Sequence, residues 1–157
     1  MAVGTFTLYR ANLDDLRLQD LVAATVKLAL VTSAYTPDAT NSGSGHSLWS
    51  SPSANEIAAG NGYTAGGATL AGLAASTATN GWKFVTNNTS WTASGGSIPA
   101  WRYAVMYVSG SLWGMTNPLI GYFLGDATPA DSPATTTGNI LVLGPNLTDG
   151  WFTITQA

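Results

Sequence analysis

Short stretches of alternating apolar and polar residues occur along most of this chain, and this period of two predicts β-strands with one buried face. Residues 5–10, TFTLYR, form the first such stretch. Residues 25–33, TVKLALVTS, are apolar almost throughout, which predicts a strand buried on both faces. We expect further strands at residues 68–77, 81–86, 89–93, 98–110, 118–126, 139–145 and 150–156. About eight short strands predict a mainly β fold, an antiparallel β-sandwich or jelly-roll-like arrangement, in a single domain of residues 1–157.

A helical pattern interrupts the strands near the N-terminus. In ANLDDLRLQDLV, residues 11–22, Asn12 is suited to cap a helix, and Asp14 and Asp15 would lie in its first turn, where the helix dipole favours acidic side chains. We therefore predict one short helix here. A single helical turn is also expected in SPSANEI, residues 51–57, with one of its two serines as the cap.

The chain carries very little charge. Only 8% of its 157 residues are charged, whereas about 25% is usual. The five Lys and Arg residues are dispersed and the net charge is −3, which argues against a nucleic-acid partner, because binding nucleic acid requires neutralisation of phosphates. A surface with few charges is typical of proteins that pack against neighbours, and also of extracellular β proteins.

Cysteine is absent, so disulfides, thiolate chemistry and cysteine-based zinc sites are excluded. The sequence has no run of about 18 apolar residues, and its N-terminus lacks the basic-then-apolar order of a signal peptide. We expect synthesis in a cytoplasm and no insertion into a membrane.

The most unusual passage is ANEIAAGNGYTAGGATL, residues 54–70. It does not match a P-loop, because no lysine follows its last glycine, and its glycines do not have the spacing of a dinucleotide-binding fingerprint. We predict instead that Asn61-Gly62 and Gly66-Gly67 supply turn residues with positive φ. This stretch is then a structural loop rather than a phosphate site.

Three side chains are candidates for fixing this loop. Tyr63 is predicted to be a buried aromatic that organises the turn rather than a ring that stacks on a ligand. Glu56 and Arg102 are the charges most embedded in apolar or glycine-rich sequence, and one hypothesis is that they pair and hold the loop against a central strand. The alternative is that they are two unrelated surface charges.

The tryptophans divide into two groups. Trp82, Trp91 and Trp101 lie at expected strand positions and are predicted to pack in the core. Trp49 and Trp113 lie in expected loops, where an exposed tryptophan is a candidate contact for another subunit. The long polar connection of residues 34–53 and the loop of residues 109–117 are therefore candidate contact segments.

Candidate chemistry is sparse. His46 is the sole histidine, and its Gly- and Ser-rich surroundings are a poor platform for a catalytic triad, so we expect it to face solvent. The acidic residues form no recognisable metal-binding spacing and no identifiable pair for glycoside hydrolysis. We therefore expect no catalytic residues, no metal and no cofactor, and hence a protein that is not an enzyme.

Several motifs in fixed order resemble a family of tailed-bacteriophage virion structural proteins. They are DLVAATVKLALVTSAYTPD, then SANEI and GNGYTAGGATL, a strand led by tryptophan, RYAVMYV, PLIGYF and a final FTI strand, and together they span about Asp15 to Thr155. The loop VSGSLWGMTNP departs from the family pattern, since Trp113 and Met115 stand where polar residues are expected. Both are candidate interface residues.

This resemblance implies a small accessory protein of the virion, most simply a capsid decoration (cement) protein that binds and stabilises the assembled head. Its partner would be the major capsid protein or another virion protein, and we expect it to be a homo-oligomer. The alternative is a carbohydrate- or receptor-binding or structural module of the phage collar, neck or tail, in which loop aromatic rings stack on sugars.

Overall fold

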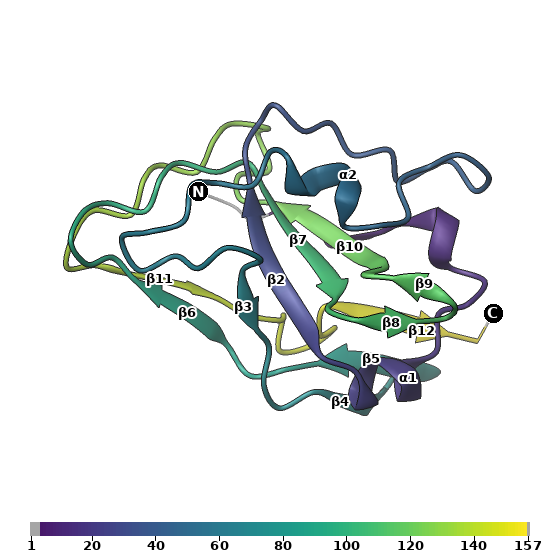
Figure 1. The fold of residues 1–157 in the computed structure, drawn as a ribbon. Coiled ribbons are helices and arrows are strands. Elements are labelled where there is room, and N and C mark those ends of the chain that lie inside the picture. The colour runs from purple at the N-terminus through teal and green to yellow at the C-terminus, as the bar shows by residue number, and fades with distance from the viewer. Residues whose placement is uncertain (1–3, 157) are drawn as a thin grey trace.

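Residues 4–156, which the computed structural model describes, form an antiparallel β-sandwich-like fold (Figure 1). The predicted mainly β class is therefore confirmed. The strands of four or more residues are β2 (Val26–Val31), β4 (Ala74–Ala78), β5 (Gly81–Val85), β6 (Thr89–Thr92), β7 (Tyr103–Val108), β10 (Leu119–Leu124), β11 (Ile140–Leu143) and β12 (Phe152–Thr155). Two-residue strands complete the set: β1 (Thr7–Leu8), β3 (Ala68–Thr69), β8 (Ser111–Leu112) and β9 (Met115–Thr116).

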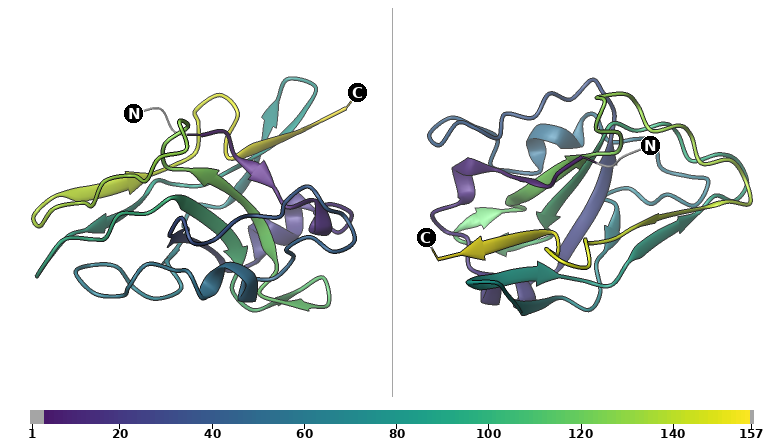
Figure 2. Two further views of the ribbon diagram at one scale, coloured as in Figure 1. Left: turned by 90° about the horizontal axis from the view of Figure 1, so that it is seen from above. Right: turned by 180° about the vertical axis from the view of Figure 1, so that it is seen from behind.

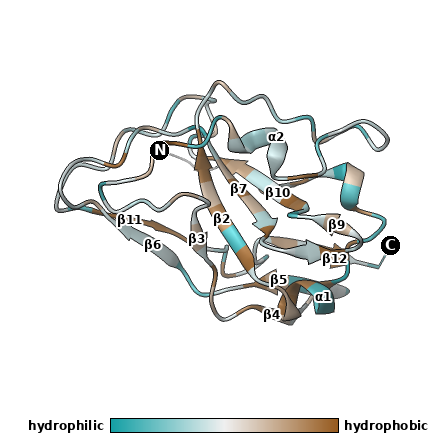
Figure 3. Cartoon of the chain, viewed as in Figure 1, coloured by the Kyte–Doolittle hydropathy of each residue, from teal (hydrophilic) through white to brown (hydrophobic). Residues whose placement is uncertain are grey.

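The central sheet has the strand order β1-β10-β7-β2-β3, and every neighbouring pair is antiparallel. Strand β2 lies inside this sheet. Its Leu28 and Leu30 enter one hydrophobic core while Ala29 and Val31 enter another on the opposite face. The prediction of a strand buried on both faces is confirmed, and Figure 3 shows apolar residues concentrated on β2, β7 and β10.

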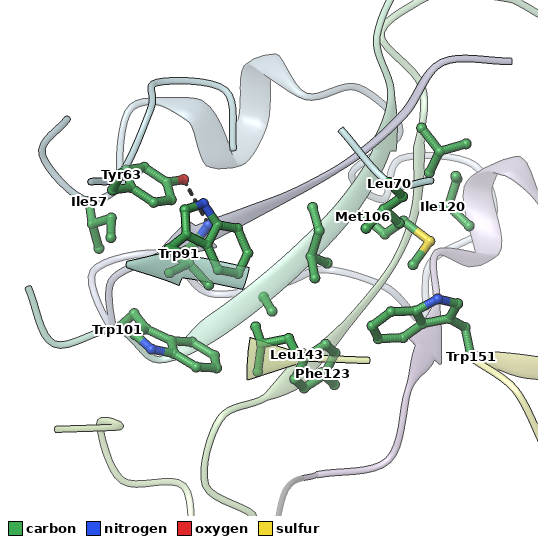
Figure 4. Close-up of a cluster of buried hydrophobic side chains, with 14 of the residues drawn as sticks. Ile57, Tyr63, Leu70, Trp91, Trp101, Met106, Ile120, Phe123, Leu143 and Trp151 are labelled. Atoms are coloured by element: carbon green, nitrogen blue, oxygen red, sulfur yellow. Dashed lines mark hydrogen bonds between the residues drawn. The ribbon is translucent and has the colours of Figure 1, made fainter. Parts of the chain in front are cut away.

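A second layer, made of the sheet β12-β5-β4 and the ribbon β11-β6, covers one face of the central sheet. Strands β5 and β6 follow each other along one side of this layer, and β11 and β12 run antiparallel beside them (Figure 1). Their inward side chains, such as Trp91 and Leu143, meet Met106, Ile120 and Phe123 of the central sheet in the larger core (Figure 4). This burial of apolar surface is the main stabilising contribution that the two layers make to each other.

The other face of the central sheet is covered by the connection between β2 and β3, which includes the short helix α2 (Ser50–Ser53). Figure 2 shows α2 and the second layer on opposite sides of the central sheet. Tyr35 is buried here, and the ring of Trp49 stacks on Tyr107 with centroids 4.4 Å apart. The long polar connection is therefore a structural cover, because its aromatic residues complete a core.

The N-terminal helix prediction is only partly correct. The chain forms a 3-10 turn at η1 (Arg10–Asn12) and then a helix α1 at Leu18–Ala23, preceded by Arg17 without a side-chain cap. Asn12 is buried and does not cap a helix; its Nδ2 donates to the carbonyls of Ser47 at 2.7 Å and Leu119 at 2.8 Å. Burial of the amide among distant carbonyls has replaced the local capping role, since a buried N–H group must find an acceptor.

The predicted helical turn in residues 51–57 is confirmed in type, because α2 lies at Ser50–Ser53. Its serine cap is not, since Trp49 precedes the helix without a side-chain cap and Ser53 Oγ instead donates to Ser50 O at 3.2 Å. Among residues 4–156, no helix is long and apolar enough to cross a membrane.

Candidate functional site

The glycine loop, residues 60–67, is a turn fixed by left-handed backbone conformations. Asn61, Gly62, Gly66 and Gly67 have φ values of 54°, 95°, 80° and 75°. The Gly60 and Tyr63 backbones exchange hydrogen bonds of 2.8 and 2.9 Å. The predicted positive φ at both glycine pairs is confirmed, and the loop is architectural.

Two of these glycines are also required by close packing. A Cβ atom on Gly62 would overlap the backbone carbonyl of Thr92, and one on Gly67 would overlap the carbonyl of Leu28 in β2. The loop backbone therefore lies directly against both the central sheet and β6. A side chain at Gly62 would push the loop away from β6, and one at Gly67 would push it away from β2.

Glu56 is the polar centre of this loop. Its Oε1 accepts a hydrogen bond from the Tyr63 hydroxyl and another from the Gly66 N–H, both at 2.7 Å. The Tyr63 hydroxyl in turn accepts the N–H of Leu30 in β2 at 2.9 Å, which is the dashed line in Figure 4. The Tyr107 hydroxyl donates to Gly66 O at 2.8 Å, so strands β2 and β7 both hold the loop.

The hypothesis that Glu56 pairs with Arg102 is wrong. Arg102 Nε instead forms an ion pair with Asp131 Oδ1 at 2.7 Å, on the exposed side of the molecule. The Tyr63 hydroxyl and the Gly66 N–H satisfy Glu56 without a cation. The loop is held by charge-assisted hydrogen bonds rather than by a salt bridge.

These contacts disfavour ionisation of the tyrosine hydroxyls. Burial, together with the hydrogen bond to Glu56, raises the pKa of Tyr63 well above its usual value of 10.0. Burial and the negative charge of Glu56 raise the pKa of Tyr107 to about 12. Both hydroxyls therefore act as hydrogen-bond donors and are poorly suited to be acids or bases near neutral pH.

A second polar chain lies under the long connection and was not predicted from the sequence. Asp38 N donates to His46 Nδ1 at 3.3 Å, so Nδ1 is an acceptor and also accepts a hydrogen bond from the Tyr35 hydroxyl at 2.8 Å. The Tyr9 hydroxyl, 2.8 Å away, can then donate to Tyr35. His46 is half-buried and stacked on Tyr35, so the expectation that it faces solvent is wrong. No local pattern links Tyr9 with His46, because they meet only when the connection folds over the sheet.

The tryptophans do not all follow their predictions. Tyr63, Trp91 and Trp101 are buried, as predicted. Trp82 is 52% exposed, and its core prediction is wrong. It points to the same side of β5 as the buried Phe84, but the cover over Phe84 does not reach it.

The candidate interface residues Trp49, Trp113 and Met115 are half-buried. Trp113 lies at the turn of the β8-β9 hairpin, and its indole N–H donates to Asp20 Oδ2 at 3.0 Å. These residues have structural partners within the chain. Their role at a contact with another protein stays a prediction.

The described residues contain no group of three or more His, Asp or Glu side chains that could hold a metal ion. They do contain an edge pocket of about 530 Å³, which sequence reasoning missed. Residues 4–6, Phe123, residues 142–146 and residues 149–151 line it. A shallower depression of about 430 Å³ lies beside Trp82 and is lined by residues 80–82 and 154–156.

Comparison of the chain with protein-family models, with curated proteins and with solved structures found no match. The resemblance to phage virion proteins therefore stays a prediction from the sequence motifs.

Proposed function

We propose that this chain is a non-enzymatic structural protein of a tailed-bacteriophage particle, a capsid decoration protein that binds and stabilises the assembled head. The observation that carries the proposal is the distribution of exposed large apolar side chains. Among residues 4–156, all but one of them belong to the second layer and its connecting loop: Trp82, Ile140, Val142, Leu147 and Ile154, with Leu13 elsewhere. Trp82 and Ile154 are cross-strand partners on the side of their sheet that carries Phe84, whereas Ile140 and Val142 lie on the outer side of β11. The second layer of this weakly charged protein thus exposes two apolar sites of the kind that bind other proteins.

The polar side chains support a structural role. Glu56 and His46, the most plausible catalytic groups in the sequence, are both held in hydrogen bonds that stabilise loops. Arg102 is paired with Asp131. None of these three groups lines the edge pocket or the depression beside Trp82.

A decoration protein of this kind acts by mass action. A protein that binds the assembled lattice, and not the free shell subunits, shifts the assembly equilibrium toward the lattice. A small homo-oligomer would match the symmetry of the shell and engage several subunits at once.

The test is the copy number of this protein relative to the major shell protein, measured by quantitative mass spectrometry of purified particles. A copy number comparable to that of the shell protein supports the head-decoration role, because only the lattice offers so many equivalent positions. A small fraction would place the protein in the neck, collar or tail, and complete absence from the particle would refute the structural role.

A second candidate function is carbohydrate binding at the depression beside Trp82. An exposed indole ring lies there with the side-chain amides of Asn80 and Gln156 among the lining residues. Aromatic rings stack on sugars and amides hydrogen-bond hydroxyl groups. A glycan array separates the two functions: a sugar preference that is lost in Trp82→Ala supports binding of glycans, and a decoration protein shows no such preference.

A further inference from the structure

The free edge of β11 has the features of a site for an additional β-strand. Ala93 N donates to Asn139 O at 2.9 Å. Because hydrogen-bonded pairs alternate along an antiparallel ladder, this bond fixes which residues of β11 direct their backbone N–H and C=O groups toward β6. By this alternation the backbone groups of Leu141 and Leu143 face β6, whereas those of Ile140 and Val142 point away from it. Within residues 4–156, the N–H and C=O groups of Ile140 and Val142 have no hydrogen-bond partner.

This edge lacks the devices that usually protect a strand edge. Charged residues, prolines, very short strands or a covering helix commonly prevent an edge from pairing with another chain. The edges of the central sheet, β1 and β3, are only two residues long. Strand β4 lies against α1. Strand β11 has the sequence ILVL, without charge or proline, and Ile140 and Val142 are 58% and 53% exposed.

The edge pocket lies beside this free edge. Val142, Leu143 and Gly144 line it together with residues 4–6. Phe6, Phe123 and Trp151 form an aromatic cluster within the lining, with ring centroids 5.9 Å apart for Phe6 and Trp151 and 5.8 Å apart for Phe123 and Trp151. A volume of about 530 Å³ falls within the range of about 300–1,000 Å³ that binding pockets span.

We propose that an extended segment of a partner protein pairs with β11 as an added strand and inserts an apolar side chain into the edge pocket. Backbone groups of Ile140 and Val142 would supply the hydrogen bonds, and the aromatic cluster would select the side chain. Asp149 also lines the pocket, and within residues 4–156 its carboxylate has no ion-pair partner. A basic residue in the segment would complement this charge.

A single extended segment fits better than the edge of a second copy of this chain. Residues 139–149 contain no Lys or Arg, so a second copy that paired through the same edge would bring no cation to Asp149. A free segment of another protein can supply one. The inference rests on the proposed function for the identity of the partner, a virion subunit, but the geometry of the edge does not depend on that identity.

The test uses the full chain, labelled with ¹⁵N, and a capped peptide of alternating valine and threonine with a terminal lysine. We expect the peptide, at millimolar concentration, to shift the amide signals of Ile140, Val142 and Gly144 and to slow amide exchange at Val142. A peptide whose central valine is replaced by proline lacks one N–H group and should bind about tenfold more weakly. Absence of shifts at these residues, or equal binding of both peptides, would overturn the inference.

Variants of the chain provide the matched controls. Val142→Pro removes the outward N–H without breaking a bond to β6 and should abolish peptide binding, whereas Val142→Thr keeps this N–H and should bind like the wild type. Asp149→Asn should weaken only the peptide that carries lysine. Wild-type chain that sediments as a dimer while Val142→Pro sediments as a monomer would show that a second copy occupies the edge, against the proposal. Particle binding that survives Val142→Pro would refute this inference and leave the proposed function standing.

Discussion

The glycine loop and the free edge of β11 differ in whether their backbone N–H and C=O groups have hydrogen-bond partners. In the glycine loop the N–H groups of Gly60, Tyr63 and Gly67 bond to loop carbonyls, and that of Gly66 bonds to Glu56. At the edge of β11, backbone groups at alternate residues stay unpaired within the described chain. The difference teaches how a chain with so few charges uses its polar groups: polar side chains stabilise the glycine loop, whereas β11 keeps unpaired backbone groups beside exposed aliphatic residues. We propose these unpaired groups as the site for a partner strand.

The largest expected effect comes from a substitution in the glycine loop. Gly67→Ala should lower the free energy of unfolding by about 4 kcal/mol, because the new Cβ would overlap the Leu28 carbonyl in addition to occupying a left-handed conformation. Gly95→Ala is the matched control. Its φ of 77° is nearly the same as the 75° of Gly67, but no atom lies within 4 Å of the added Cβ. Denaturant unfolding should show a loss of only about 1 kcal/mol for this control; equal losses would mean that the close packing of the loop is unimportant.

A smaller effect is expected from substitution of Glu56, whose carboxylate accepts the hydrogen bonds that hold the loop. Glu56→Ala removes both hydrogen bonds to Oε1 and should cost about 3 kcal/mol of unfolding free energy, given about 1.5–3 kcal/mol for a bond to a charged group and partial replacement by water. Glu56→Gln keeps an acceptor oxygen and should cost about half as much. Asp131→Asn, which breaks the exposed pair with Arg102, should cost less than about 1 kcal/mol. A ranking with Asp131→Asn as the most damaging variant would contradict the assignment of Glu56.

Alkaline pH tests two buried tyrosines without a substitution: Tyr107, which bonds to the glycine loop, and Tyr35, which lies under the long connection. The tyrosinate is the charged form, and burial raises the pKa of Tyr107 and of Tyr35 to about 12 from 10.0. Above pH 10 the unfolded chain therefore loses these protons before the folded chain does, so stability present below pH 10 falls as the pH rises toward 12. Each unit of difference in pKa between the folded and the unfolded chain corresponds to about 1.4 kcal/mol of unfolding free energy per group. About 2 kcal/mol of this free energy should therefore be lost per tyrosine by pH 12.

The variant that checks this assignment is Tyr107→Phe. It should make the decline between pH 10 and 12 shallower, while its stability at pH 7 falls only by the lost bond to Gly66, about 1 kcal/mol. Denaturant midpoints measured across this range separate the two effects. An unchanged alkaline slope would show that Tyr107 ionises as freely in the folded chain as in the unfolded one.

The contrast between the two regions also explains which features the sequence could predict. The glycine loop was predictable because Asn-Gly and Gly-Gly pairs specify positive φ by their own chemistry, and β2 because a strand buried on both faces is apolar throughout. The ion pair of Glu56 was predicted wrongly because its partners, Tyr63 and Gly66, bear no charge to mark them.

Features that depend on distant segments were missed. The amide of Asn12 bonds to Leu119, 107 positions away, and no local pattern carries that information. Alternation placed Trp82 on the side of the buried Phe84 but could not show that Trp82 itself stays exposed. The free edge of β11 depends on the register with β6 and on the position of residues 4–6, neither of which the sequence specifies by spacing.

The smallest expected effect comes from a substitution at the free edge of β11. Val142→Thr should leave the free energy of unfolding within about 0.5 kcal/mol of the wild type, because the side chain is 53% exposed and its backbone groups are not used by the fold. Leu143→Thr, one residue along, is the matched control: this side chain is buried in the core, and its substitution should cost about 2 kcal/mol or more through lost apolar contacts and a buried hydroxyl. Equal losses in thermal or denaturant unfolding would mean that Val142 supports the fold. A large difference would mean that the exposed aliphatic residues of β11 make little contribution to stability, as the proposed pairing with a partner strand requires.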